Sequence, residues 1–171
     1  MTEEYVSAAL TDVHAVSAFD CGVASLNDWL RSQAWRAQKA GTARTFVWTT
    51  EHDPASVWAY YSIAPTEIMR SEVTGSIAGG YSTIPAYLLA RLAVSSRLRG
   101  HGYGGELLAD ALTRIVAAAR LVGGRLIVVD AIDAGAANFY RHHHFIPVKG
   151  DPHRLVIKMA TVEQYLADSP T

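Results

Sequence analysis

The chain has 171 residues, of which half are hydrophobic and 18% are charged. A chain of this length usually forms one domain, and its apolar content supports a full core, which excludes an intrinsically disordered protein. The formal net charge of −1, from 15 basic and 16 acidic residues, excludes a nucleic-acid binder that relies on an overall positive charge, but it leaves room for a local basic patch.

The single cysteine, Cys21, can form neither an internal disulfide nor a thiolate metal cage, and it is typical of a reducing cytoplasm. The N-terminal residues Met1–Glu4 are acidic and lack an apolar run, so we expect no secretory signal. The apolar stretch near 115–131 is broken by arginines and glycines too soon for a membrane span. We therefore expect one cytoplasmic domain over 1–171.

Strands and helices alternate along the chain, which indicates an α/β architecture. Ser25, with Asp28 as its capping-box partner, is expected to begin a helix that Gly41 ends. The expected strands lie at 5–10, 44–50, 57–64, 86–94, 126–131, 145–148 and 155–159, and the other helices at 104–122 and 134–142. Residues 65–85 are expected to form a loop with at most one short element, and the tail after Tyr165 is the candidate linker.

A glycine-rich turn between the central strand and the long helix is the most informative segment. Four glycines lie within 100–105, and Arg99 precedes them. Glycine lets the backbone approach a ligand closely, and the free N–H groups at a helix start bind phosphate. The alternative is a tight turn without a ligand, but four glycines between a strand and a helix favour a phosphate site.

The type of phosphate loop follows from the flanking residues. A Walker A loop needs Lys and then Ser or Thr after its last glycine, whereas Glu106 and Leu107 stand here. A dinucleotide-binding fold needs an acid about 20 residues on, and Asp130 lies further away. The turn instead resembles the acetyl-CoA loop of the GNAT acetyltransferase family, R/Q-x-x-G-x-G/A, as Arg99-x-x-Gly102-x-Gly104.

A second segment, Ala136-x-x-Phe139-Tyr140-x-x-x-His144-Phe145, is similar to the later A-x-x-F-Y-x-x-x-G-F signature of that family. The usual glycine is replaced by His144, which must adopt the turn with a Cβ, and Asp133 stands where asparagine is common. The resemblance implies the GNAT fold, a central mixed and mostly antiparallel sheet flanked by helices, with acetyl-CoA as cofactor. The residues that it implies for cofactor binding are Leu92, Ala93, Val94, Arg99, Gly100, His101, Gly102, Tyr103, Gly104 and Gly105. Asn138, two residues before Tyr140, is a candidate to hydrogen-bond the pantetheine or the acceptor, and the alternative is a solvated helix residue.

The chain is also similar to the GNAT toxins of type II toxin–antitoxin modules. The similar segments include Phe19-x-x-Gly22-x-x-x-Leu26-x-x-Trp29-Leu30 and the stretches at 41–47, 59–62 and 89–94. The resemblance implies an enzyme that acetylates the α-amine of aminoacyl-tRNA and blocks translation. It also implies a ribbon-helix-helix antitoxin as partner and a homodimer.

Acetyl transfer to an amine requires a proton for the leaving thiolate, and Tyr140 is the candidate donor. A phenol has a pKa of about 10, so it is protonated at neutral pH; the alternative is a tyrosine that only packs. No general base stands out, because the central strand has no carboxylate and Glu67 and Glu72 lie in the preceding loop. An α-amine with a pKa near 7.7 is roughly one-sixth unprotonated at pH 7, so the missing base favours such an acceptor over lysine.

The placement of charge favours a polyanionic partner. No acid lies within 29–50 or 73–105, and arginine outnumbers lysine 12 to 3, which suits phosphate. The candidate tRNA-binding residues are Arg31, Arg36, Lys39, Arg44 and Arg91. Three tryptophans are candidates to stack on bases, although tryptophans at helical spacing lie more often in the core: Trp29, Trp35 and Trp48.

Two other hypotheses about the function stay open. One is a GNAT enzyme that acts on a small amine or a protein N-terminus, and the other is a non-catalytic module that binds coenzyme A for regulation. The tract His142–His144 is interpreted as a helix end rather than a metal site, because adjacent residues on a helix point in different directions.

Overall fold

The computed structural model describes residues 3–168. Met1 and Thr2 of the N-terminal segment, and the last three residues of the expected linker, lie outside the described residues. The strands are β1 Tyr5–Ala9, β2 Arg44–Thr50, β3 Ala59–Met69, β4 Thr83–Val94, β5 Leu126–Asp130, β6 Ile146–Val148 and β7 Asp151–Lys158. The helices are α1 Ala24–Ser32, α2 Ala34–Ala40, α3 Gly75–Ala78, α4 Tyr103–Val122, α5 Ala134–His142 and α6 Met159–Asp168, with 3-10 turns η1 Arg70–Glu72 and η2 Ser96–Leu98.

The strands are hydrogen-bonded in the order β1-β2-β3-β4-β5-β7-β6. β4 and β5 run parallel, whereas the β1–β2, β2–β3, β5–β7 and β6–β7 pairs are antiparallel. This mixed, mostly antiparallel sheet confirms the expected fold class. Contacts between Cα atoms divide the chain into two compact units, the first made of residues up to 64 with 91–111 and the second of 65–90 with those from 112 onward.

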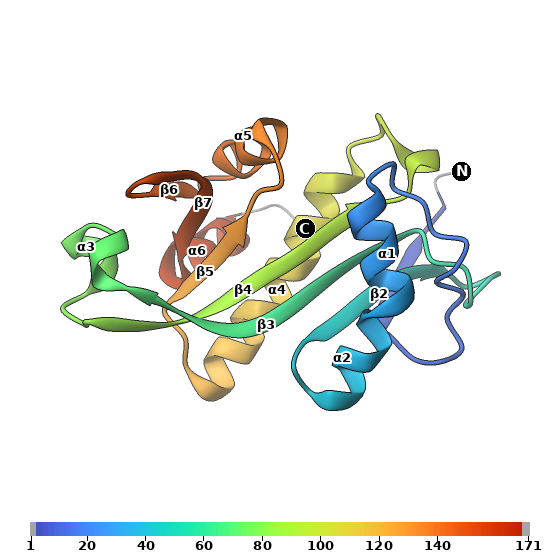
Figure 1. Cartoon of the computed structure of the whole chain (residues 1–171), viewed down its shortest axis with the longest axis horizontal. Helices are drawn as coiled ribbons and strands as arrows, with labels where there is room; N and C mark the ends of the chain where they lie inside the picture. Colours follow the sequence, from blue (N-terminus) through green and yellow to red (C-terminus); the bar gives the residue numbers. More distant parts are fainter. Residues whose placement is uncertain (1–2, 169–171) are drawn as a thin grey trace. The chain divides into compact units, whose positions relative to one another are not determined.

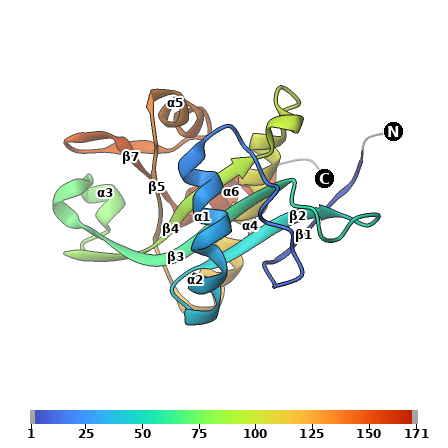
Figure 2. The same cartoon turned by 45° about the vertical axis from the view of Figure 1, so that its right-hand side comes forward.

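In the first unit, helices cover both faces of β2. α1 and α2 lie over one face of β2 and β3 in both views (Figure 1; Figure 2), where Leu30 and Ala34 pack with Val47 in a buried cluster. Trp48 points to the opposite face, because successive strand residues alternate. There its indole N–H donates to Asp110 of α4 at 3.2 Å, so α4 covers that face.

In the second unit, the short helix α3 lies within the connection between β3 and β4 (Figure 1). Ile77 of α3 packs with Val128 of β5 and Val156 of β7 in a buried cluster. The Arg125 Nε–H donates to the carbonyl of Ile77 at 3.0 Å, which fixes α3 to the start of β5. α5 and α6 both contact β7.

The expected start of the first helix was wrong. α1 begins at Ala24, its N-cap is Val23 without a side-chain bond, and Asp28 instead pairs with Arg31. The single expected helix is two helices, because Gln33 separates α1 from α2. The predicted stop is confirmed, since Gly41 has the left-handed φ of 74°.

Two further boundaries differ from expectation. β3 continues through Pro65 to Met69, so the expected loop 65–85 begins as strand and then contains η1 and α3. The expected last strand ends at Lys158, and α6 runs from Met159 to Asp168 through the tail that was assigned as a linker. Within 3–168, no helix combines the length and apolar character needed to cross a membrane.

Candidate active site

The glycine turn has the backbone shape of an anion cradle. It follows β4 and η2, where the Ser95 hydroxyl accepts from the Arg97 N–H, and it leads into α4 at Tyr103. Gly100 and Gly102 have φ of 83° and 77°, which side chains rarely adopt. A Cβ at either glycine would meet no atom within 4 Å, so the space beside both is open to a ligand. The turn therefore fits a phosphate held by backbone N–H groups at the start of a helix.

Arg99 ties this turn to the segment before α1. Its Nη2 donates to the carbonyl of Cys21 at 3.3 Å, and a Cβ on Gly22 would meet that same nitrogen at 2.5 Å. The Ser96 N–H and hydroxyl both donate to the carbonyl of Asp20, at 2.9 and 3.0 Å. Gly22, with φ of 84°, is therefore required by its turn, whereas the flexible end of Arg99 could move away from an added Cβ.

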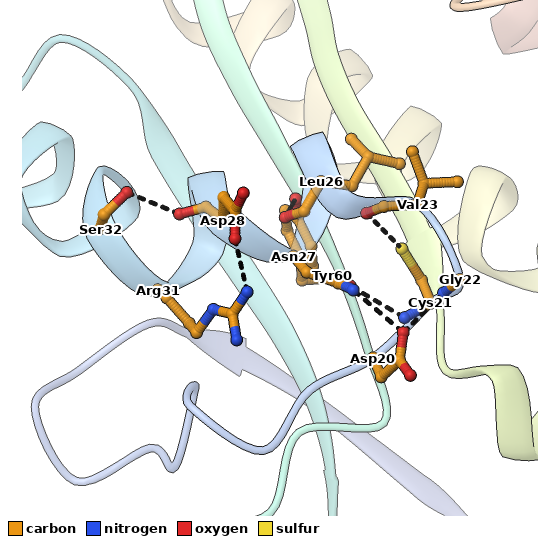
Figure 3. Close-up of polar contacts among 10 residues, drawn as sticks. All are labelled: Asp20, Cys21, Gly22, Val23, Leu26, Asn27, Asp28, Arg31, Ser32 and Tyr60. Atoms are coloured by element: carbon orange, nitrogen blue, oxygen red, sulfur yellow. Dashed lines mark hydrogen bonds and ion pairs between the residues drawn. The ribbon is translucent and has the colours of Figure 1, made fainter.

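A set of polar contacts fixes the start of α1 (Figure 3). Asp20 Oδ1 accepts from the Gly22 N–H at 2.8 Å and from the Asn27 amide at 2.9 Å, while Asn27 Oδ1 accepts from the Cys21 N–H. The Tyr60 hydroxyl donates to the carbonyl of Leu26 at 2.7 Å, and burial raises the pKa of Tyr60. Sequence reasoning missed Asn27, whose only signal was an amide just inside a helix start.

The candidate tRNA-binding residues all lie in the first unit. Arg31, Arg36, Lys39 and Arg44 are exposed. The Arg44 Nη1 donates to a carbonyl of α2 at 2.8 Å, and the Lys39 ammonium lies 5.7 Å from the ring centre of Trp35. Arg36 is exposed and makes no hydrogen bond or ion pair within residues 3–168, so its guanidinium is available to a partner.

Two of the three tryptophans belong to the core rather than to a surface for bases. Trp48 is only 6% exposed and stacks on Tyr5. Trp29 stacks on Tyr60, and the guanidinium of Arg91 lies 4.6 Å from its ring centre. Trp35 alone of the three is exposed, at 37%. Trp48 and, in part, Trp29 therefore occupy the core positions that were the more frequent expectation for them.

The candidate catalytic tyrosine lies in the second unit. Asp133 caps its helix α5 by accepting the Ala136 N–H at 2.8 Å. Tyr140 is 7% exposed, its ring packs against Phe139 and Phe145, and burial raises its pKa. The phenol is therefore protonated at neutral pH.

The remaining candidate residues lie on α5, in the turn after it, in β3 and in η1. Asn138 is exposed on α5, and His144 adopts φ of 73° in the turn that follows that helix, as the sequence predicted. His144 packs on Tyr165, and burial lowers the pKa of His143. Glu67 is exposed, whereas Glu72 accepts the Met69 N–H at 2.9 Å.

Comparison with known proteins decides the family. A family model described as "Acetyltransferase (GNAT) domain" matches residues 53–147, which is more than half of the chain. The chain belongs to the GNAT acetyltransferase family. As a GNAT acetyltransferase it uses acetyl-CoA as its acetyl donor, which confirms the expectation from the glycine turn.

Among its relatives is a tRNA-acetylating toxin of Mycobacterium tuberculosis (strain ATCC 25618 / H37Rv), 32% identical over 93% of this chain and 95% of the relative. Two similar solved structures are of the toxin AtaT. One is complexed with acetyl-methionyl-tRNAfMet (26% identity, TM-score 0.87, covering 95% of this chain and 99% of AtaT). The other is a mutant AtaT bound to the C-terminus of the antitoxin AtaR and acetyl-CoA (25% identity, TM-score 0.83, covering 96% and 99%).

Proposed function

We propose that this chain transfers an acetyl group from acetyl-CoA to the α-amine of aminoacyl-tRNA and thereby blocks translation. The observation that carries the proposal is similarity along nearly the whole chain to a tRNA-acetylating toxin, together with the likeness to AtaT, which was solved with an acetylated aminoacyl-tRNA. The missing carboxylate in β4 agrees with an acceptor whose amine is partly unprotonated at neutral pH.

We assign the cofactor to the glycine turn and its flanking strand. The backbone N–H groups of the turn hold the pyrophosphate. The turn consists of Arg99, Gly100, His101, Gly102, Tyr103, Gly104 and Gly105. The strand end Leu92–Val94 offers backbone groups to the pantetheine arm, and Asn138 offers an amide. When bound, acetyl-CoA supplies a thioester whose carbonyl carbon accepts the amine and whose sulfur leaves.

Tyr140 holds the proton that the leaving sulfur needs. Because burial raises its pKa, the hydroxyl stays protonated at neutral pH but is a weak acid. Its main contribution is therefore a hydrogen bond to the sulfur as negative charge develops, with proton transfer completing the departure. The proton released by the amine goes to solvent, and Tyr140 regains its own from solvent, so protons balance over the cycle.

The tRNA backbone contacts the basic residues of the first unit, Arg31, Arg36, Lys39, Arg44 and Arg91. Arg36 is the strongest contributor, because no described side chain competes for its guanidinium. Arg31 must first leave Asp28, and Arg44 is held by a carbonyl of α2. An arginine fork matches a phosphate better than an ammonium does.

The proposal extends to the domain organisation, the oligomeric state, the antitoxin and the cellular location of the enzyme. We propose that the two compact units form one catalytic domain, that two copies form a homodimer, and that a ribbon-helix-helix antitoxin neutralises the enzyme in the cytoplasm. The antitoxin AtaR on a mutant AtaT supports the existence of such a partner.

Two experiments test this function: expression of the chain in growing cells, and labelling of a panel of acceptors by the purified protein. Expression of the chain alone should stop growth, and Tyr140→Phe should restore it. With radiolabelled acetyl-CoA, the purified protein should label aminoacyl-tRNA but not deacylated tRNA, polyamines or peptides with a free N-terminus. Labelling of a small amine or a peptide would instead indicate the alternative enzyme, and binding of acetyl-CoA without any transfer would indicate a regulatory module.

A further inference from the structure

A charged triad interrupts an apolar face of the second unit. Asp130, the last residue of β5, pairs across strands with Arg154 of β7, and Glu72 of η1 completes the triad. The Arg154 Nη1 lies 3.5 Å from both oxygens of Asp130, and its Nε lies 3.6 Å from Glu72 Oε1. Two residues earlier on the same face, the pair Val128 and Val156 is buried core. The triad therefore begins where the core ends.

The two carboxylates of the triad have different surroundings. Glu72 is anchored, because its Oε2 accepts the Met69 N–H and its carbonyl accepts the Lys149 N–H, both at 2.9 Å. Asp130 makes side-chain contact only with Arg154 in the part of the chain that the structure describes, and its side chain is 54% exposed. Glu72 thus holds Arg154, Arg154 holds Asp130, and the outer lone pairs of Asp130 face solvent.

The triad is not a saturated ion-pair network. Two carboxylates and one guanidinium leave a net charge of −1, and the separations of 3.5 and 3.6 Å exceed those of good hydrogen bonds. The Arg154 Nε is buried and has no hydrogen-bond acceptor among residues 3–168.

The position of the triad links it to the candidate catalytic tyrosine. Asp130 ends β5, and three residues later Asp133 caps α5, the helix that carries Tyr140. α5 packs on β7, the strand that carries Arg154. β4 pairs with β5 as far as Leu89 opposite Val129 and then continues to Val94, so β5 ends at Asp130 while its neighbour runs on.

We propose that Asp130 binds the α-amine of the acceptor aminoacyl group, with Arg154 and Glu72 as positioning residues that hold its carboxylate. This inference rests on the proposed function. An ionised carboxylate only accepts hydrogen bonds, so it takes one N–H of the neutral amine and leaves the nitrogen lone pair for the acyl carbon. Deacylated tRNA lacks this amine, so Asp130 gives the enzyme a preference for charged tRNA.

Binding of bulk aminoacyl-tRNA, compared with the same tRNA after mild alkaline deacylation, tests the proposal in the absence of acetyl-CoA. The wild-type chain should prefer the charged form by on the order of tenfold, and Asp130→Asn should remove most of that preference, since a hydrogen bond to a charged group is worth about this much. The matched control is Asp151→Asn, an exposed carboxylate at the start of β7, which should keep the full preference. Asp130→Asn should also raise the KM for aminoacyl-tRNA more than it lowers kcat.

The outcomes separate this proposal from the proposed function. A wild-type chain that does not acetylate aminoacyl-tRNA refutes the proposed function and, with it, this role. A wild-type chain that acetylates it, while Asp130→Asn folds and keeps the preference, overturns the role of Asp130 alone. If Asp130→Asn lowers the melting temperature strongly, Asp130→Glu keeps the charge and decides: partial preference supports the proposal, and no preference in a folded variant contradicts it.

Discussion

Replacing Tyr140 with phenylalanine separates catalysis from packing at the candidate site. The substitution keeps the ring contacts with Phe139 and Phe145, whose centroids lie 5.2 and 5.4 Å away. Within residues 3–168 the Tyr140 hydroxyl makes no hydrogen bond, so its removal breaks none. We therefore expect the free energy of unfolding to change by less than about 1 kcal/mol, or roughly 2–4 °C in melting temperature.

The expected loss of rate is much larger. Help from a general acid is worth roughly 10²–10⁴-fold, and the raised pKa of Tyr140 places it at the lower end. A loss of about 10²-fold corresponds to about 2.7 kcal/mol of transition-state stabilisation. Single-turnover acetylation of aminoacyl-tRNA, with affinity for acetyl-CoA measured separately, should place this loss in kcat. A stable variant with a rate within about threefold of wild type would refute the role of the hydroxyl.

Four further perturbations test other parts of the structure. Gly102→Asp should weaken acetyl-CoA binding in calorimetry by well over tenfold, because it adds a Cβ and a negative charge beside the phosphate, whereas Gly150→Asp has similar backbone strain (φ of 81°) and should not. Asp133→Ala removes the cap of α5 and should cost about 1 kcal/mol in urea unfolding. Burial raises the pKa of Tyr60, so stability should be full below pH about 10 and fall as pH rises through the raised value; Tyr60→Phe should flatten that fall. Arg36→Gln should make the log–log salt dependence of tRNA affinity shallower by about 0.7–0.9 without changing acetyl-CoA affinity.

Local signals in the sequence predicted the elements that position the site. The glycine turn, the start of α4 and the helix of Tyr140 each depend on residues close together in the chain, and His144 shows this most clearly. A family pattern that places glycine there requires a left-handed residue, and His144 has φ of 73°. Gly41 likewise ends α2 because glycine adopts that conformation without strain.

The sequence did not predict features that depend on contacts between residues far apart in the chain. Trp29 and Trp48 alternate with basic residues in the sequence, but Tyr60 of β3 stacks on Trp29 and Tyr5 of β1 stacks on Trp48. Ser25 was a good cap by residue type, yet the contacts of Asp20 and Asn27 fix the chain before α1, and the N-cap lies two residues earlier, at Val23.

Two misses had different causes. α6 did have a local signal, since Met159 and Val162 are buried at helical spacing, but the expected strand included Met159 and the expected linker began after Tyr165. The triad of Glu72, Asp130 and Arg154 had none, because strand pairing and the turn after β3 bring together residues far apart in the chain.

Mass spectrometry of the 3′ end of tRNA tests the central claim most directly. Bulk aminoacyl-tRNA is incubated with acetyl-CoA and either the wild-type chain or Tyr140→Phe, and nuclease digestion then releases the aminoacyl-adenosine. We expect aminoacyl-adenosine that is heavier by one acetyl group in the wild-type reaction, with fragmentation placing the group on the α-amine, and little of it in the variant reaction. Aminoacyl-adenosine of unchanged mass after complete incubation with a folded wild-type chain that binds acetyl-CoA would contradict the claim.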